Sequence, residues 1–310
     1  MAGQTFAGCE FLAVDDGSVD ATRSLLLAWR EIDPRVRVLD SAGAGLIAAL
    51  RLATDAARGE YIARMDADDI AEPDRFAKQV ALLDARPEIV ACGTLVRYFP
   101  REVVRDGARR YEQWINALAG PDEILRDLFV ECPIPHPTLV VRAKALRSAG
   151  GYVDSGWPED YDLVLRLWGA GGRFAKVPEV LLHWRESEGR ASRTHTRYSA
   201  AAFVACKVHH LLERGVDGRP IVVWGAGPVG KSFARELLRQ GGCLAAFVDL
   251  DPRRIGQTIH GAPVIAPGRI GEYRDAFTLA AVGSASARAE IRSALGAAGL
   301  VELRDFRAVA

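Results

Sequence analysis

The stretch Gly59-Glu-Tyr-Ile-Ala-Arg-Met-Asp-Ala-Asp-Asp69 decides how the first half of the chain is interpreted. Its part Glu60–Met65 is typical of a short β-strand. That strand leads directly into the aspartates of the acidic segment, the name used below for Arg64–Asp69. Open α/β sheets bind their ligands outside the carboxyl ends of the strands. The stretch therefore predicts a ligand site at the edge of a sheet.

A second acidic turn, Asp15-Asp16-Gly17-Ser18, follows the apolar run Phe11–Val14 in the same way. Because both turns end strands of one predicted sheet, we expect them to face one crevice. Carboxylates repel a diphosphate, but a hard divalent cation binds carboxylate and phosphate oxygens together. The two turns therefore predict a metal–diphosphate site, whereas an isolated Asp-x-Asp pattern is more often a solvated loop or a helix cap.

Apolar periodicity places further elements along the chain. We expect strands at 36–39, 89–98, 138–142 and 180–185, and helices at 20–29, 46–57, 73–83, 161–168 and 199–213. Strands that alternate with helices predict an α/β fold with a mainly parallel, doubly wound sheet. At 310 residues the chain also exceeds one compact domain. We expect a first domain at 1–198, a helix and linker at 199–218, and a second domain at 219–310.

Several motifs in order make the first domain recognisable: Gln4-Thr-Phe6, Glu10-Phe-Leu-Ala-Val-Asp-Asp-Gly-Ser-Val-Asp20, the stretch 59–69 above, Gly150-Gly-Tyr152 and Pro158-Glu-Asp-Tyr-Asp-Leu-Val-Leu-Arg166. Over roughly residues 4 to 200 the chain resembles the family-2 glycosyltransferases of the GT-A fold. The resemblance implies an inverting transfer of a sugar from a nucleoside diphosphate donor. The acceptor would be a hydroxyl of a saccharide or lipid-linked molecule in cell-surface polysaccharide or glycolipid synthesis.

The resemblance also implies roles for single residues. Asp16 would hold the nucleotide base, Asp66 would face the ribose and metal region with Arg64 beside the donor, and Asp68 would ligate Mn²⁺ or Mg²⁺. Asp160 would be the general base for the acceptor hydroxyl; acids at this position also cap helices. For three further residues we expect contacts with phosphate or acceptor, with packing or a salt bridge as the alternative in each case: His136, His183 and Arg185.

Members of this family begin with a strand and a helix that would precede Gln4 in this chain. The strand would lie between the strand ending at Asp15 and the strand ending at Met65. We therefore expect either that the protein starts about 25 to 35 residues upstream, or that this form is marginally stable and poorly active. The second possibility keeps a different function class open, a catalytically impaired nucleotide-sugar-binding or scaffold protein.

The second domain opens with a strand, Ile221–Trp224, followed by the G-x-G-x-x-G pattern of Gly225, Gly227 and Gly230. A strand at 244–248 ends at Asp249, close to the offset of about 20 residues at which an acid contacts a ribose. With further strands expected at 278–282 and 301–303, the unit resembles a small Rossmann domain such as the front domains of bacterial sugar acetyltransferases. Two interpretations remain: it binds NAD or a nucleotide, or it is a docking domain. Redox chemistry of its own ranks last, since no catalytic Tyr-x-x-x-Lys follows.

The composition restricts the partners. Forty basic and forty acidic side chains cancel, which gives no general attraction to nucleic acid. Five scattered cysteines fit reduced thiols better than disulfides or a zinc site. With no apolar run of about 20 residues and no signal-peptide pattern, we expect a cytoplasmic protein, peripheral at the inner face of the membrane when its acceptor is lipid-linked.

Overall fold

The computed structural model describes residues 1–187, 189 and 195–310. Two compact units emerge: the first comprises Met1–Pro121 and Ile134–Arg193, the second Asp122–Pro133 and Thr194–Ala310. Both combine helices with sheets, so the predicted α/β class is confirmed. Within the described ranges, no helix is long and apolar enough to cross a membrane.

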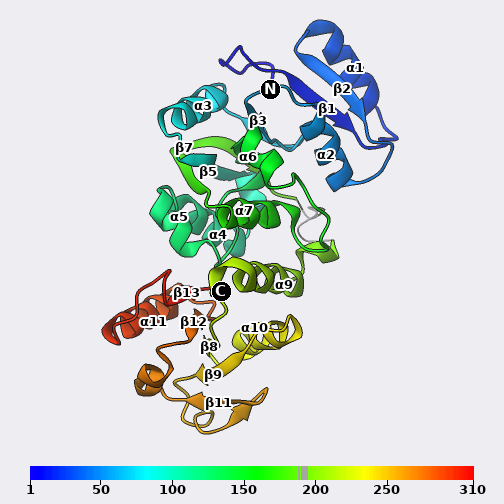
Figure 1. Cartoon of the computed structure of the whole chain (residues 1–310). Helices are drawn as coiled ribbons and strands as arrows, with labels where there is room; N and C mark the ends of the chain where they lie inside the picture. Colours follow the sequence, from blue (N-terminus) through cyan, green and yellow to red (C-terminus); the bar gives the residue numbers. More distant parts are fainter. Residues whose placement is uncertain (188, 190–194) are drawn as a thin grey trace. The chain divides into compact units, whose positions relative to one another are not determined.

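The first unit starts with a small parallel sheet of two strands, β1 (Phe11–Asp15) and β2 (Val36–Asp40). Phe11 lies opposite Val36 in the register and both are buried. The Trp29 ring stacks on Phe11 at 5.5 Å between centroids. This apolar packing holds the flanking helices α1 (Thr22–Ile32) and α2 (Leu46–Ala56) near the pair (Figure 1). The acidic turn Asp15–Ser18 leaves the carboxyl end of β1.

A separate five-stranded sheet forms the main core of the first unit, in the order β3-β6-β5-β7-β4. Its strands are β3 (Tyr61–Ala63), β6 (Val140–Arg142), β5 (Ile89–Phe99), β7 (Arg173–Arg185) and β4 (Ile70–Ala71). The helices of the unit that follow α2 are α3 (Arg75–Ala85), α4 (Asp106–Ala117), α6 (Ala143–Ser148) and α7 (Glu159–Gly169).

The expectation of a mainly parallel sheet was wrong for this part of the chain. Only β5 and β7 run parallel here, while β3–β6, β5–β6 and β4–β7 are antiparallel. β6 enters the sheet between β3 and β5 and runs antiparallel to both, and β4 pairs with β7 at the opposite edge. The alternation of elements in the sequence does not reveal this, because pairing order is set by contacts distant in the chain.

β1 and β3 lie in different sheets, the first beside β2 and the second beside β6. These are the strands that end at the two acidic turns, which we expected in one sheet with a further strand between them. The expectation of a single sheet was wrong. That a strand is missing between them stays a prediction.

The second unit holds a six-stranded sheet in the order β10-β11-β9-β8-β12-β13. Its strands are β8 (Ile221–Trp224), β9 (Leu244–Val248), β10 (Thr258–Ile259), β11 (Ala262–Ile265), β12 (Phe277–Ala280) and β13 (Phe306–Ala308). All pairs except β10–β11 are parallel. The chain goes from β8 outward to β9 on one side and to β12 on the other.

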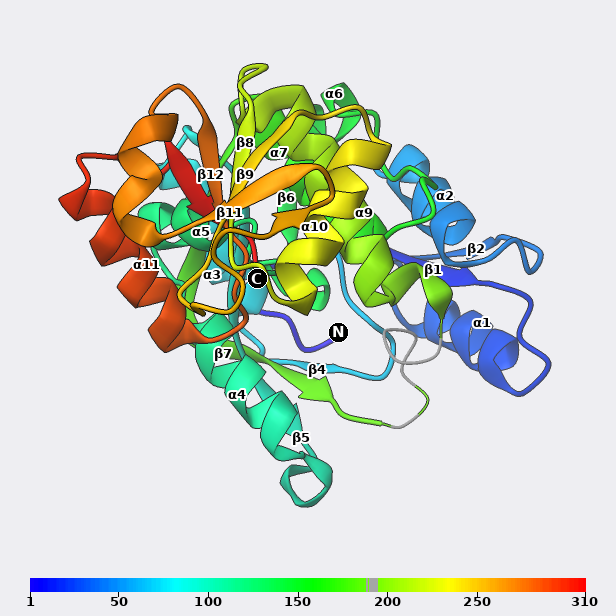
Figure 2. The same cartoon turned by 90° about the horizontal axis from the view of Figure 1, so that it is seen from below.

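Helices α5 (Pro121–Asp127), α9 (Ala200–His210), α10 (Pro228–Arg239) and α11 (Ala285–Ala297) accompany this sheet. α9 and α10 lie side by side in both views (Figures 1 and 2). The strand expected at 301–303 was wrong, because Leu303 has a φ of 73° and interrupts extended backbone. The last strand is β13 instead.

Candidate active site

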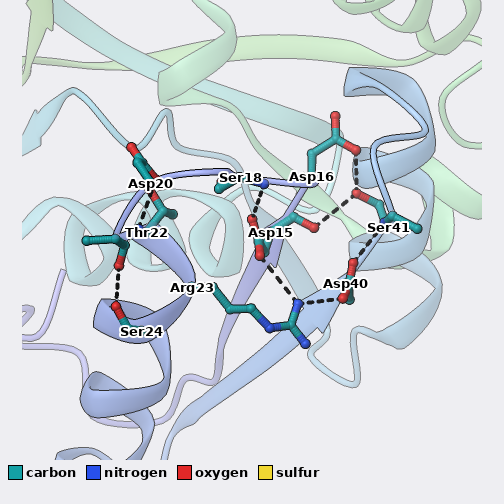
Figure 3. A network of polar contacts seen from close by, with 11 residues as sticks. Asp15, Asp16, Ser18, Asp20, Thr22, Arg23, Ser24, Asp40 and Ser41 are labelled. Carbon is teal, nitrogen blue, oxygen red and sulfur yellow. Dashed lines mark hydrogen bonds and ion pairs between the residues drawn. The ribbon is translucent and has the colours of Figure 1, made fainter.

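The acids of the first turn are both engaged by the protein (Figure 3). Asp15 is buried; its Oδ1 accepts the Ser18 N–H at 3.0 Å and its Oδ2 lies 3.4 Å from Arg23 Nη1. The hydrogen bond from Ser18 and the Arg23 charge lower the pKa of Asp15. Asp16 is exposed, and its Oδ1 accepts bonds from Ser41 Oγ at 2.7 Å and Gly45 N at 3.1 Å. The turn is thereby tied to the loop after β2.

The acidic segment is held differently. Arg64 Nη2 lies 2.5 Å from Asp66 Oδ1. The Asp68 side chain is exposed, and no residue of the described chain hydrogen-bonds its carboxylate. Asp69 is buried; its Oδ1 accepts the Arg185 N–H at 2.7 Å, while its Oδ2 finds no partner among the described side chains and backbone. Burial, with the charges of Asp66 and Asp68 adding, raises the pKa of Asp69 to about 7.

The end of β7 contacts the acidic segment and holds it in place. Arg185 Nε donates to the Asp68 carbonyl at 2.7 Å, and its guanidinium lies 4.5 Å from the centroid of the Phe99 ring. His183 Nε2 is 2.7 Å from Glu72 Oε1, just beyond the segment. The structure thus places the two expected phosphate contacts, His183 and Arg185, against the acidic segment and its neighbour.

Asp160 lies half-buried in the first turn of α7, where its Oδ1 accepts the Tyr161 N–H at 2.7 Å. Burial works to lower the pKa of Arg64, but the charge and hydrogen bond of Asp66, aided by Asp160, hold it above its ordinary value. Arg64 thus pairs with Asp66 and also feels the charge of Asp160.

His136 belongs to the same neighbourhood. Its Nε2 lies 2.8 Å from the Tyr152 hydroxyl, and its Nδ1 lies 3.8 Å from Glu159 Oε1. All three side chains are buried. Burial, and then the Arg64 charge, lowers the pKa of His136 well below its ordinary value, so the ring is neutral at pH 7. The structure places His136 under the start of α7 and not on an exposed acceptor surface.

The two acidic turns share no hydrogen bond or ion pair in the part of the chain that the structure describes. Asp16, Asp66 and Asp68 are therefore not joined into one cluster by direct contacts. Asp69, Glu72 and Tyr152 were not among the site residues expected from the sequence, although Asp69 is the last acid of the acidic segment and Tyr152 belongs to the Gly-Gly-Tyr motif.

Asp66 and Asp68 supply the hard oxygen donors that Mn²⁺ or Mg²⁺ prefers. No third His, Cys, Asp or Glu among the described residues converges with them on one point. A divalent ion here would keep positions for water and for phosphate oxygens, which is how Mg²⁺ is usually held in phosphate sites. The free carboxylate of Asp68 fits that use.

The three glycines of the glycine turn in the second unit differ in whether the fold requires glycine at their position. Gly225 has a φ of 114°, which favours glycine, and a Cβ on Gly230 would lie 1.7 Å from the Gly225 carbonyl oxygen. At Gly227 a Cβ would meet only Arg254 Nη1, at 3.9 Å. Asp249, at the end of β9, accepts the Ala226 N–H at 2.8 Å and lies 3.0 Å from Arg254 Nη1. Asp249 is therefore hydrogen-bonded to the glycine turn and paired with Arg254.

Comparisons with known proteins agree with this architecture. The family model described as Glycosyl transferase family 2 matches residues 1–148. The chain is 31% identical over 183 residues to the amylovoran biosynthesis glycosyltransferase AmsE of Erwinia amylovora, covering 59% of this chain and 66% of that protein. It is 30% identical over 204 residues to the putative glycosyltransferase EpsE of Bacillus subtilis, covering 64% of this chain and 70% of that protein.

Two uncharacterized glycosyltransferases of Haemophilus influenzae match over 48% and 58% of their lengths, so the chain spans about half to two thirds of several curated relatives. Among solved structures, TarS residues 1–349 of S. aureus in complex with UDP-GlcNAc aligns with a TM-score of 0.50 and 15% identity, over 69% of this chain and 61% of that one. This likeness shows a GT-A-type fold. On the family model and these relatives, the chain belongs to glycosyl transferase family 2.

Proposed function

We propose that the protein is an inverting, metal-dependent glycosyltransferase that moves a sugar from a nucleoside diphosphate donor to a hydroxyl group in cell-surface polysaccharide or glycolipid synthesis. One observation carries the proposal. The acidic segment presents the Asp68 carboxylate to solvent with no hydrogen-bond partner among the described residues, next to Asp66, which Arg64 holds. A carboxylate left free at a strand end suits a metal–diphosphate site.

Asp160 is the proposed general base. Its carboxylate would take the proton of the acceptor hydroxyl as the oxygen attacks the anomeric carbon and the bond to the diphosphate breaks, which inverts that carbon. Asp68 would hold Mn²⁺ or Mg²⁺, with Asp66 beside it. When bound, the cation would stabilise the charge that develops on the departing diphosphate. Asp16, exposed on the first acidic turn, would contact the nucleotide base.

The relatives support the substrate classes. AmsE is named for amylovoran biosynthesis, and the TarS structure holds UDP-GlcNAc. For this chain we therefore propose a nucleotide-sugar donor and a saccharide or lipid-linked acceptor at the membrane surface.

The test is a panel of UDP-, GDP- and dTDP-sugars, assayed for hydrolysis and transfer with Mn²⁺, with Mg²⁺ and with a chelator. We expect one donor to turn over, only with a divalent ion, and NMR of the product to show the inverted anomer. Donor binding without turnover would support the impaired, scaffold-like alternative. Retention of configuration would remove Asp160 as the base.

For the second unit we propose nucleotide binding at the glycine turn, with NAD or a nucleotide sugar as the ligand. The observation that favours it is Gly227. Neither its φ of −80° nor its surroundings require glycine, and at the N-cap of α10 a residue without a side chain allows a phosphate to approach the helix N-terminus closely. Asp249 would then add a ribose hydroxyl to the contacts it already makes.

Gly227→Ala tests this in the full chain by thermal-shift titration with NAD(H) and UDP-sugars. The methyl group fits the fold, so the melting temperature without ligand should stay the same while the ligand-induced shift disappears. Gly230→Ala is the contrast, since its Cβ would collide with the Gly225 carbonyl and destabilise the unit. A wild-type chain that shows no shift with any nucleotide would favour the docking interpretation.

A further inference from the structure

Arg75, the first residue of α3, stands out as the largest fully buried side chain of the described chain. Its exposed fraction is 0%, and it forms no ion pair with any described residue. Burial lowers the pKa of Arg75 to about 9, so the group still carries its charge at neutral pH. Burying a charged group without a carboxylate partner is costly. The burial of a charged arginine at position 75 therefore needs a specific reason.

The hydrogen bonds of Arg75 indicate that reason. Nη2 donates to the Arg64 carbonyl at 2.7 Å, at the first residue of the acidic segment. Nε donates to Gln79 Oε1 at 3.0 Å. The Gln79 amide in turn donates to the Thr138 carbonyl at 2.8 Å, in the turn that carries His136. Arg75 and Gln79 together thus connect α3 with the main chain at Arg64 and at Thr138.

Three buried polar atoms of Arg75 and its neighbours lack a hydrogen-bond partner. Arg64 Nη1, Asp69 Oδ2 and Arg75 Nη1 are buried, and each is without a hydrogen-bond partner among the residues described. The Arg64 and Asp69 charges both act on Arg75. Buried polar atoms left in this state mark a site where a water or ligand atom completes the network.

We propose that Arg75 is a positioning residue for the acidic segment. Its guanidinium fixes the Arg64 carbonyl, and with it the direction in which the chain enters Asp66-Ala67-Asp68-Asp69, so that the carboxylates are preset for a divalent cation. The inference rests on the proposed function for its consequence, but the positioning itself is a property of the chain. It explains why an arginine is buried here, since only its fork reaches the Arg64 carbonyl and Gln79 together.

Arg142 offers a matched control at the other end of α3. Its Nη2 donates to the Leu83 carbonyl at 2.6 Å, its Nε donates to the Ile89 carbonyl at 3.0 Å, and its guanidinium lies over the Tyr61 ring. Arg75 likewise bonds a backbone carbonyl and lies beside an aromatic ring, that of Phe76. The control therefore shares the chemistry but not the acidic segment.

The experiment compares Arg75→Lys with Arg142→Lys in the full chain. Arg75→Gln, which keeps one neutral donor, is the second variant where lysine is not accommodated. Hydrogen–deuterium exchange is followed for the peptide 64–72, and Mn²⁺ binding is followed by titration of the free-ion electron spin resonance signal. Neither readout depends on turnover.

We expect Arg75→Lys to speed exchange at 64–72 and to weaken Mn²⁺ binding, each by roughly 10-fold, because one charge-assisted bond to the segment is lost. Arg142→Lys should leave both unchanged. Equal exchange at 64–72 in the two variants, or no change in either, overturns the proposal. A wild-type chain that binds no Mn²⁺ and turns over no donor refutes the proposed function instead, and the exchange comparison still judges Arg75.

Discussion

The two acidic turns of the first unit have similar sequences but different surroundings. On the first turn, Asp15 and Asp16 both accept hydrogen bonds from the protein, from Ser18 and from Ser41 and Gly45. On the acidic segment, the Asp68 carboxylate has no such partner within the described residues, and one oxygen of Asp69 is buried without one. Both turns follow a short strand, so the strand does not cause the difference.

The difference lies in what surrounds each turn. The first packs against a loop that offers backbone N–H groups and a hydroxyl, which satisfy carboxylates. The second is held through its carbonyls, by Arg75 at Arg64 and by Arg185 at Asp68, and through two of its acids, Asp66 and Asp69. Arg185 binds Asp68 at the carbonyl, so that the Asp68 carboxylate keeps its oxygens available. The difference between the turns therefore lies in Asp68, whose main chain is anchored while its carboxylate is not.

The sharpest way to break this comparison is Asp68→Ala. We expect loss of transfer by at least about 10³-fold, because the proposed cation would lose its protein ligand. The melting temperature should stay the same, since the carboxylate is exposed. The control is Asp55→Ala, which removes an exposed aspartate on α2 and should keep full activity. Unchanged turnover and Mn²⁺ dependence in Asp68→Ala would remove Asp68 from the mechanism.

Asp160→Asn separates chemistry from donor binding. The amide keeps the size of the side chain but cannot take a proton, so turnover should fall by roughly 10²–10⁴-fold. Donor affinity, measured by calorimetry with a non-reacting nucleoside diphosphate, should barely change. If affinity collapses together with turnover, Asp160 serves binding or the start of α7.

The comparison also shows what the sequence could and could not predict. β1, β2, β9 and the acidic turns were placed correctly, since short apolar runs followed by acids or glycines are local signals. The antiparallel pairing of β3 and β6 was not, because it joins residues about 80 positions apart. Local patterns do not encode which strands become neighbours.

The same limit applies to the site. Asp68 and Asp160 could be proposed because their chemistry is in their side chains. The part played by Arg75 could not, because its partner is the carbonyl of Arg64, and every residue has a carbonyl. For His183 and Arg185 the sequence indicated the neighbourhood, whereas the contacts with Glu72 and Asp68 needed the fold.

A milder test compares the two acids of the first turn. Asp15→Asn should lower the melting temperature by a few degrees, because the buried side chain loses its charge beside Arg23 and accepts the Ser18 N–H only as a neutral oxygen. Asp16→Asn should leave the melting temperature unchanged and raise the donor KM by about 10-fold, as expected for a lost bond to the base. The reverse pattern would make Asp15 the donor contact and Asp16 the structural acid.

The smallest expected effect concerns the buried ring under α7. Because the folded-state pKa of His136 lies well below its ordinary value of 6.5, the unfolded chain binds more protons than the folded one at mildly acidic pH. Stability contributed by the neutral ring is fully present above about pH 6.5 and is lost as the pH falls towards the folded pKa, at up to about 1.4 kcal/mol per pH unit. His136→Gln, which keeps a polar side chain near the Tyr152 hydroxyl, should remove this dependence.

Urea unfolding at pH 7 and pH 5, followed by tryptophan fluorescence, measures the dependence, since every tryptophan except Trp224 lies in the first unit. We expect the wild-type chain to lose more stability between the two values than His136→Gln. His209→Gln, a partly exposed histidine of the second unit, is the control and should behave as the wild type. Equal losses in wild type and His136→Gln would mean that His136 takes up a proton as readily in the folded protein as in the unfolded chain, and that the ring beside the Tyr152 hydroxyl is not held neutral.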